Sequence, residues 1–333
     1  MAQLPGRDAL FQRIQSLTSE QFGETALDVY RYQAAHNPVY RRYLELIGRL
    51  EQEPAQWWDI PCLPIELFKS HTLQTGRWTP ERVFTSSGTT GQVPSRHAVR
   101  SVADYLANAR RGFRAVYGPV EDYCVLALLP SYLERTGSSL VAMAQDFIER
   151  SQHPESGFFL DNQRALLERL TQCRQQGIPV LLIGVSFALL DLAEAHPTAL
   201  GERVIIMETG GMKGRRKELT REALHAQLGA AFGQERIHSE YGMTELLSQG
   251  YSTGDGLFVP APTLRIRVRE LTDPLQVLPS GRAGGVNLFD LANLDTISFI
   301  AAQDIGRVYA DETFRILGRI DASDVRGCNL MVQ

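Results

Sequence analysis

The segment QRALLERLTQCRQQGIPVLLIGV, residues 163–185, decides the fold class. Its first part carries Leu166, Leu170 and Cys173 on one face, which predicts an amphipathic helix that ends at Gly177. The apolar run 178–185 that follows is typical of a strand buried in a sheet. A helix that leads directly into a buried strand indicates a parallel α/β layer.

The same alternation extends in both directions from this segment. Short apolar runs predict buried strands at residues 123–129, 157–160 and 203–207. The stretches around them predict helices at residues 138–150, 186–195 and 217–232. The predicted fold class is therefore α/β, with doubly wound sheet layers.

The two ends of the chain show other patterns. Residues 7–50 carry apolar side chains at helical spacing with a break at Asn37-Pro38, and an extended link, IPCLP, follows at 60–64. After about residue 257, short predicted strands at 264–268, 286–288, 297–301 and 314–317 alternate with Pro, Gly and Asp turns. We expect a helical N-terminal cap at 1–80, an α/β nucleotide-binding core at 81–256 and a small β-rich lobe at 257–333.

Composition excludes several classes of protein. The 333 residues suffice for about two domains, and 34 Lys and Arg against 38 Asp and Glu argue against non-specific nucleic-acid binding. No apolar stretch reaches the ~20 residues of a membrane span. The start MAQLPGRDAL lacks the pattern of a secretory signal, and the four cysteines form no CxxC pair. We expect a cytoplasmic protein without a disulfide framework or zinc site.

A loop rich in hydroxyl groups and glycine follows the predicted strand end Val83-Phe84. Glycine lets a backbone approach a ligand closely, and exposed N–H and hydroxyl groups can surround phosphate oxygens. The lysine of a Walker loop is missing, and taken alone a flexible turn explains the pattern better. Its residues are Thr85, Ser86, Ser87, Gly88, Thr89, Thr90 and Gly91.

Three further motifs offer parts that a nucleotide needs. The run EYGMTE at 240–245 supplies an aromatic ring, a tight turn, a hydroxyl group and a carboxylate. Upstream, Gly210 and Gly211 follow a predicted strand, where ligands of open α/β sheets bind. Near the end, the segments of Asp304 and Arg319, QDIGR at 303–307 and GRID at 318–321, each pair an acid with a nearby glycine and arginine, and such an acid can bind ribose hydroxyls. Each motif alone is also compatible with ordinary turns.

Together, in this order, the motifs resemble those of the adenylate-forming superfamily of acyl and aryl acid ligases. TSSGTTG at 85–91 is similar to its phosphate loop, YGMTE at 241–245 to its adenine and magnesium motif, and GRID at 318–321 to its hinge motif. The segments PCLPIELFKS at 61–70, LLPSYLER at 128–135, GGMKG at 210–214 and DLAN at 290–293 resemble the acyl-protein synthetases of bacterial bioluminescence. Those enzymes activate a fatty acid with ATP and carry it on a cysteine near the C-terminus.

The resemblance implies a role for each matching residue. ATP would lie with its β- and γ-phosphates on the loop at 85–91, its adenine between Tyr241-Gly242 and Gly210-Gly211, and its ribose at Asp304, with Arg319 beside it. Thr244 would contact the α-phosphate, and Glu245 would bind Mg²⁺. Cys328, in a terminal RGCN segment, would accept the acyl group from the adenylate and deliver it to a partner such as an acyl reductase or an acyl-carrier protein.

The sequence departs from the superfamily pattern at its C-terminal end. Members usually add a lid domain with a catalytic lysine, whereas here no lysine follows Lys217. We therefore expect an N-terminal-domain-like fold that lacks the usual C-terminal lid domain. Lys213, Arg215, Arg216 or Arg319 would then supply the cation, or a partner protein would.

Two other functions stay open. One is a ligase of the same fold that passes an aryl or other carboxylic acid to coenzyme A or to an amine. The other is a non-catalytic nucleotide-binding subunit.

Overall fold

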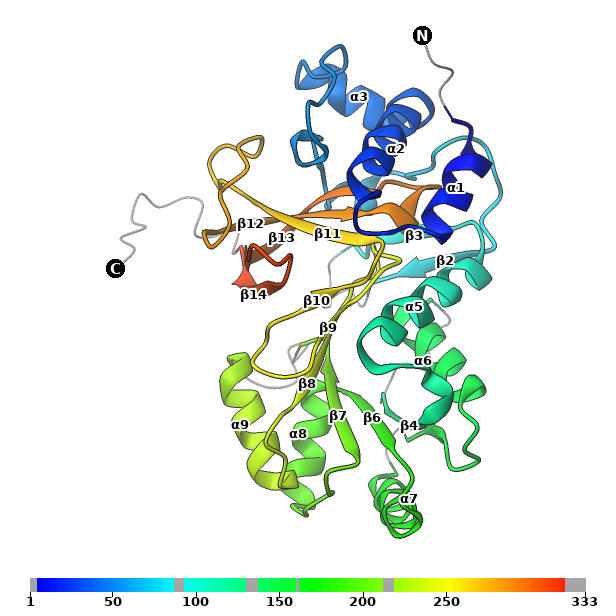
Figure 1. Ribbon diagram of the computed structural model, residues 1–333, viewed down its shortest axis with the longest axis vertical. Helices are drawn as coiled ribbons and strands as arrows, with labels where there is room; N and C mark the ends of the chain where they lie inside the picture. Colours follow the sequence, from blue (N-terminus) through cyan, green and yellow to red (C-terminus); the bar gives the residue numbers. More distant parts are fainter. Residues whose placement is uncertain (1–4, 87–92, 130–136, 160–161, 212–218, 321–333) are drawn as a thin grey trace.

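A computed structural model of the chain describes residues 5–86, 93–129, 137–159, 162–211 and 219–320. It contains a five-stranded and a seven-stranded sheet, and a separate two-stranded hairpin. Figure 1 shows the N-terminal helices and the five-stranded sheet in one half of the molecule and the seven-stranded sheet with its helices in the other. The two halves meet near the ends of strands β7 and β8.

The elements alternate as the sequence predicts in the middle of the chain. The α-helices are α1 (Arg7–Gln15), α2 (Phe22–His36), α3 (Pro38–Leu46), α4 (Leu67–Ser70), α5 (Val102–Tyr117), α6 (Ser139–Arg150), α7 (Gln163–Gln176), α8 (Ser186–Ala195) and α9 (Arg221–Phe232). The strands are β1 (Leu63–Pro64), β2 (Arg82–Thr85), β3 (Arg96–Val99), β4 (Cys124–Leu128), β5 (Gly157–Phe158), β6 (Val180–Val185), β7 (Val204–Thr209), β8 (His238–Tyr241), β9 (Gly250–Ser252), β10 (Val259–Pro260), β11 (Leu264–Arg269), β12 (Ala283–Asp290), β13 (Phe299–Val308) and β14 (Phe314–Arg319). Short 3₁₀ helices cover Trp57–Asp59, Val120–Asp122 and Leu291–Asn293.

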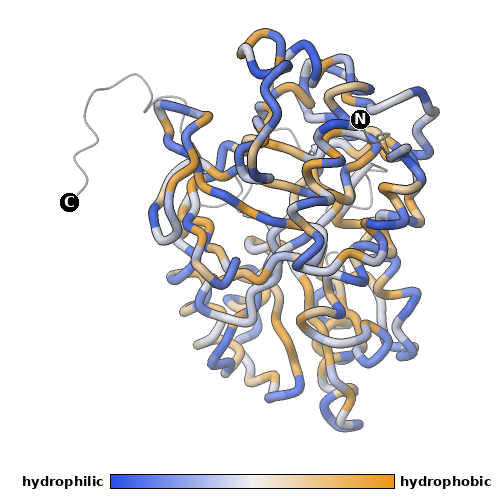
Figure 2. The backbone as a smooth tube through the Cα atoms, turned by 45° about the horizontal axis from the view of Figure 1, so that its top comes forward, coloured by the Kyte–Doolittle hydropathy of each residue, from blue (hydrophilic) through white to orange (hydrophobic). Residues whose placement is uncertain are grey.

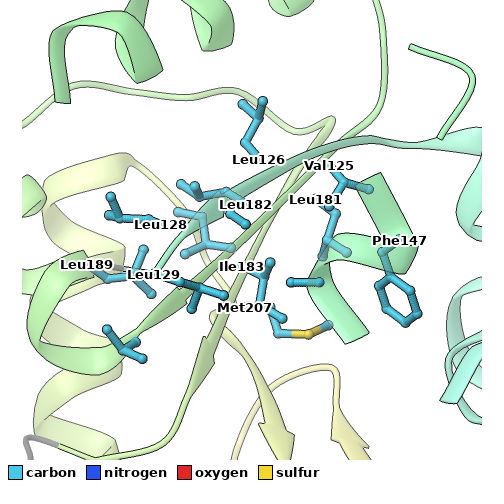
Figure 3. Close-up of a cluster of buried hydrophobic side chains, with 14 of the residues drawn as sticks. Val125, Leu126, Leu128, Leu129, Phe147, Leu181, Leu182, Ile183, Leu189 and Met207 are labelled. Carbon is cyan, nitrogen blue, oxygen red and sulfur yellow. The ribbon is translucent and has the colours of Figure 1, made fainter. Parts of the chain in front are cut away.

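The seven-stranded sheet has the order β10-β9-β8-β7-β6-β4-β5. Strands β5, β4, β6, β7 and β8 pair in parallel, whereas β9 and β10 add an antiparallel edge. Every residue of β6 is buried, which explains its continuous apolar sequence, because a central parallel strand is covered on both faces. Figure 3 shows the leucine, isoleucine and valine side chains that β4 and β6 contribute to this core.

Helices cover the seven-stranded sheet on both faces. Helices α8 and α9 lie on one side, and α5 and α6 lie on the other (Figure 1). Helix α7 begins after Asn162, whose side chain accepts a hydrogen bond from the Ala165 N–H. It ends at Gly177, which adopts the left-handed conformation (φ 68°) that glycine tolerates best.

The five-stranded sheet joins the two ends of the chain. Its order is β1-β13-β12-β11, with β14 on β13, and β1 from the N-terminal part pairs in parallel with β13. Helices α1 to α3 share one hydrophobic cluster with this sheet, so the N-terminal helices and the β-rich segment pack as one body. In Figure 2 the backbone of this half is orange mainly along its interior strands and blue at its outer loops.

Two strands extend further than the sequence suggests. Strand β8 covers His238–Tyr241, so Glu240 and Tyr241 of the EYGMTE motif are strand residues held between β7 and β9. Asp304 lies within β13, although its Asp-Ile-Gly sequence resembles a turn. Pairing with neighbouring strands outweighs the weak local preference at these positions.

None of the helices in the described ranges is long and apolar enough to cross a membrane.

Candidate active site

The site begins where β7 and β8 end side by side. They are parallel neighbours, so their carboxyl ends meet at one edge, and Gly210 and Gly242 directly follow them. Gly210 has a positive φ of 66°, which lets the chain turn sharply, and its carbonyl oxygen accepts a hydrogen bond from the Ser186 hydroxyl at 3.0 Å. The structure thus brings together the two glycine motifs that the sequence analysis selected.

Tyr241 and Asp304 form the second part of the site. The Tyr241 hydroxyl donates to Asp304 Oδ2 at 2.7 Å, and Arg319 Nε lies 3.4 Å from Asp304 Oδ1. Asp304 and Arg319 are opposite one another on the paired strands β13 and β14. Burial raises the pKa of Asp304, although the hydrogen bond from Tyr241 and the charge of Arg319 oppose this shift.

The ring of Tyr241 is largely buried. It meets Phe258 and Phe314 edge to face, with ring centroids 6.0 and 5.5 Å apart. Only 9% of the residue is exposed. The family resemblance implies that this ring contacts adenine, and in the structure its hydroxyl group also anchors Asp304.

The base of the hydroxyl-rich loop lies close to Glu245. Ser86 and Ser95 bond reciprocally: the Ser86 N–H donates to the Ser95 carbonyl at 3.1 Å, and the Ser95 N–H donates to Ser86 Oγ at 2.9 Å. Burial raises the pKa of Glu245, while a hydrogen bond with the Ser95 side chain and the charges of Arg319 and Lys69 lower it. Ser95 therefore connects the loop to the predicted metal-binding carboxylate.

Lys69 is a functional candidate that the motif analysis did not select. It lies on the exposed side of α4, a helix that is fixed at two points beside the site. The ring of Phe68 packs edge-on against His97, with centroids 5.5 Å apart, and Glu66 accepts a hydrogen bond from Gln303 at 2.6 Å. The segment at 61–70 was noted only for its family resemblance, and its single lysine was the available signal.

A buried histidine holds the backbone of Thr244. His97 Nδ1 lies 2.8 Å from the Thr244 carbonyl oxygen, and its Nε2 lies 3.1 Å from the Thr296 hydroxyl. Since a carbonyl can only accept, Nδ1 carries the proton and Nε2 accepts from Thr296. Burial lowers the pKa of His97 to about 4, so the ring is neutral and positions the motif.

The DLAN segment holds the same motif from the other side. Asp290 accepts hydrogen bonds from the N–H groups of Leu247 and Ser248 at 2.8 and 3.0 Å. Asn293 Nδ2 donates to the Glu245 carbonyl oxygen at 2.8 Å. These bonds between the five-stranded and seven-stranded sheets fix the backbone at 244–248.

Two buried carboxyl groups occupy opposite faces of the strand ends. Glu208 faces α9, where Arg221 Nε and His225 Nε2 lie 3.5 and 3.6 Å from its Oε1. Burial favours a raised pKa for Glu208, but the hydrogen bond from His225 and the charge of Arg221 outweigh it and lower the pKa. Burial raises the pKa of Glu240 to about 7, and the hydrogen bond from Thr209 offsets only part of the shift.

Several selected residues lie outside the described residues. They are Ser87, Gly88, Thr89, Thr90, Gly91, Lys213 and Cys328. The other three cysteines, Cys62, Cys124 and Cys173, are all buried. Burial raises the pKa of Cys62 and of Cys124 to about 12, so neither supplies a thiolate at neutral pH.

Within the described ranges, no group of three or more His, Cys, Asp or Glu side chains could hold a metal ion by itself. A Mg²⁺ ion at Glu245 would need oxygen ligands from a bound phosphate, which is the usual manner of Mg²⁺ binding in nucleotide sites.

The fold is that of the N-terminal domains of adenylate-forming enzymes. A 2-hydroxyisobutyryl-CoA ligase, solved in an open conformation with 2-HIB-AMP and CoA, matches with a TM-score of 0.66 and 16% identity over 96% of this chain and 80% of its own. ATP-bound MatB from Rhodopseudomonas palustris matches with a TM-score of 0.53 and 18% identity over 73% of this chain. The match covers 49% of the MatB chain, about half its length.

Residues 16–333 match the family model described as "Acyl-protein synthetase, LuxE". The chain therefore belongs to this acyl-protein synthetase family. A search of curated protein sequences found no match.

Proposed function

We propose that this protein uses ATP to activate a carboxylic acid as an acyl-adenylate and then transfers the acyl group to a protein thiol. The observation that supports this most strongly is the convergence of Glu245, Asp304 and the base of the hydroxyl-rich loop at one edge of the seven-stranded sheet. Family membership and the adenylate-forming fold support the same reaction.

ATP would be held by groups that already surround this edge. Asp304 keeps lone pairs free to accept from ribose hydroxyls after bonding Tyr241 and Arg319, because a carboxylate offers about four acceptor sites. Ser86 and the hydroxyl groups that follow it would contact the outer phosphates. Catalysis would then rest on alignment and charge stabilisation, since two negatively charged groups must meet.

Mg²⁺ would bind between the phosphates and Glu245. The buried carboxyl group of Glu245 lies near two cations, so its oxygens are held close to the expected phosphate positions. The metal would neutralise charge on the phosphate oxygens when bound.

Binding of the nucleotide is tested by thermal unfolding. Millimolar Mg-ATP should raise the melting temperature, because a ligand that binds only the folded state stabilises it. Glu245→Gln should remove most of the Mg²⁺-dependent part of this rise, whereas Glu222→Gln on the exposed face of α9 should keep it. An unchanged melting curve of the wild type would contradict the proposal.

Lys69 would supply a positive charge to the reacting phosphates. Lys69→Ala should lower acid-dependent ATP–pyrophosphate exchange by at least about tenfold, as removal of a preorganised charge does, and Lys69→Arg should restore part of it. Lys213→Ala is expected to lower exchange more than Lys217→Ala. If the Lys69 and Lys213 variants both match the wild type, the cation comes from elsewhere, such as a partner protein.

Cys328 would carry the acyl group. Thiolates attack mixed anhydrides readily, and a thioester keeps the acyl group activated for a later transfer to a reductase or carrier partner. Cys328→Ser should leave pyrophosphate exchange intact and abolish a hydroxylamine-sensitive mass increase of one acyl group. Cys173→Ser is the matched control. If the Cys328→Ser variant still gains the adduct, or the wild type never gains one with any acid, Cys328 is not the carrier. A wild type that is never acylated would favour an external acceptor such as coenzyme A or an amine.

A further inference from the structure

Residues on β8 alternate between two faces of the sheet, and this separates the neighbouring residues Glu240 and Tyr241. Tyr241 reaches Asp304 on β13. Glu240 is opposite Thr209 on β7 and opposite Tyr251 on β9, so these three residues lie in a row across three strands on one face. The proposed ribose site and Glu240 therefore lie on different sides of the strand.

The row that contains Glu240 faces helices α5 and α6. The Tyr251 ring packs edge-on against Phe113 of α5 at 5.8 Å, and its hydroxyl group lies 4.0 Å from Met143 Sδ of α6. Figure 1 shows α5 and α6 on the opposite side of the sheet from α8 and α9. Glu208, one step away on the other face, contacts α9 instead.

The two oxygens of Glu240 have different surroundings. Oε2 accepts the hydroxyl hydrogen of Thr209. Oε1 occupies the space beside Gly242, where a Cβ atom would lie only 2.3 Å from it. Gly242 is exposed, and Glu240 itself is 8% exposed, so an acceptor oxygen lies at the edge of an accessible space.

A reacting acid must approach the α-phosphate from the side that the nucleotide leaves free. With ribose at Asp304, the nucleotide would occupy the Tyr241 side of β8 and leave the α5–α6 side free. An acid on that side would meet Gly242 and the Oε1 atom of Glu240. Burying a carboxyl group is costly unless a partner binds it. Arg221 and His225 lie beside Glu208, whereas no ion pair in the described part of the chain involves Glu240, whose partner is the Thr209 hydroxyl.

We infer that Glu240 lines the acid subsite and selects carboxylic acids that carry a hydroxyl or amino group able to donate a hydrogen bond to its Oε1. This inference rests on the proposed function, because it assigns the substrate class of that same site. It departs from the expectation of a plain fatty acid, whose apolar chain would leave this acceptor without a donor.

The test is ATP–pyrophosphate exchange with matched sets of acids of four and eight carbons. Each set contains the unsubstituted acid, its 2-, 3- and ω-hydroxy derivatives and its ω-amino derivative. At least one substituted acid should exceed the unsubstituted acid of equal length in kcat/KM by about tenfold or more, the range that an unpaired buried polar group costs. If the unsubstituted acids are the best substrates at both lengths, the inference is wrong.

Variants identify the residue and the donor. Glu240→Leu should reduce the preference ratio to about one or reverse it, whereas Ser239→Ala, on the opposite face of β8, should keep it. Glu240→Gln retains an oxygen acceptor without a charge, so it should preserve a preference for hydroxyl groups and lose one for amino groups. If both Glu240 variants keep the wild-type ratio, another residue selects the acid.

Failure of the proposed function gives a different result. No exchange with any acid would overturn adenylation itself and the inference with it. Exchange with plain acids alone would overturn only the role of Glu240.

Discussion

Glu208 and Glu240 lie at the ends of neighbouring strands and are almost equally buried, at 4% and 8% exposed, yet their environments differ. Glu208, on the α9 face, has a cation and a histidine beside it, and its pKa is lowered. Glu240, on the α5–α6 face, has a threonine hydroxyl, and its pKa is raised to about 7. The chain thus compensates one carboxyl group with charge, and the other is the group that we propose binds the acid.

Burial alone therefore does not predict the direction in which the pKa of a carboxyl group shifts. Both residues are buried acids within one strand of each other, but only Glu208 is held by charges that stabilise its ionised form. The groups opposite each carboxyl, rather than its depth, decide whether it serves the fold or the site.

Removal of the Glu208 charge should have the largest effect on stability. Glu208→Gln leaves the Arg221 and His225 side chains without their carboxylate, and loss of one partner of a buried pair costs about 3–5 kcal/mol. Arg221 is partly exposed, so the lower end of that range is expected. Urea unfolding at pH 7.5 measures it, with the exposed Glu222→Gln as control, and equal stability of both variants would contradict the pairing.

Glu240→Gln should stabilise the protein at alkaline pH, whereas Glu208→Gln should destabilise it. The pKa of Glu240 is about 7 in the folded chain against 4.5 for the free group, so the folded state binds more protons between these values. The contribution of Glu240 to the free energy of unfolding therefore falls as the pH rises from about 4.5 to 7, by about 3 kcal/mol in total. Glu240→Gln should flatten this fall and exceed the wild type in stability at pH 8.

Asp290 contributes a slope of the same sign at lower pH. Burial raises its pKa to about 6 from 3.8, so the slope above pH 6 is the part that identifies Glu240. A wild-type stability that rises between pH 6 and 8 would rule out a raised pKa of Glu240.

His97 extends the comparison from buried acids to a buried base, whose pKa burial lowers. Its pKa is about 4 in the folded chain against 6.5 for the free group, so the unfolded state binds more protons between these values. The contribution of His97 to the free energy of unfolding should fall by about 2 kcal/mol as the pH drops from 6.5 to 5. Burial also lowers the pKa of His238 to about 4, so His238 adds a fall of the same sign. His97→Gln should therefore remove the share of His97 and keep that of His238, and an unchanged acid limb would mean that the His97 ring is already protonated in the folded state.

The smallest expected effect is that of Thr209→Val. The variant removes the hydroxyl donor to Glu240 while nearly keeping the volume, which costs about 1 kcal/mol. Thr209→Val should also shift the pH range over which Glu240 lowers stability to higher pH, since the lost hydrogen bond lowers the pKa of Glu240. A shift of that range to lower pH would contradict the hydrogen bond from Thr209 to Glu240.

Much of the fold could be predicted because its signals are local. The helix and strand at 163–185 are observed at α7 and β6, since amphipathic spacing and a glycine end mark them in the sequence. The strand character of Tyr241 and Asp304 could not be read locally, because it depends on pairing with β9 and β14.

The site could be predicted only in part for the same reason. Glycine and hydroxyl motifs identified Gly210, Tyr241, Glu245 and Asp304, which the structure brings together. Lys69 lies on the short helix α4, which is distant in sequence from the EYGMTE motif. Ser95 contributes through its hydrogen bonds to Ser86 at the base of the loop, which the sequence does not reveal. Glu240 was quoted within EYGMTE, but only strand register reveals which face it occupies.

The central claim, that this chain forms an acyl-adenylate, is tested most directly by rapid-quench mass spectrometry of the products. The wild-type protein would be mixed with Mg-ATP and the set of plain, hydroxy and amino acids, and the quenched products analysed. The account predicts an acyl-AMP species with one pyrophosphate released for each adenylate formed, and both should be lost in Glu245→Gln. Acid-dependent formation of ADP and an acyl phosphate, or no acid-dependent consumption of ATP, would contradict it.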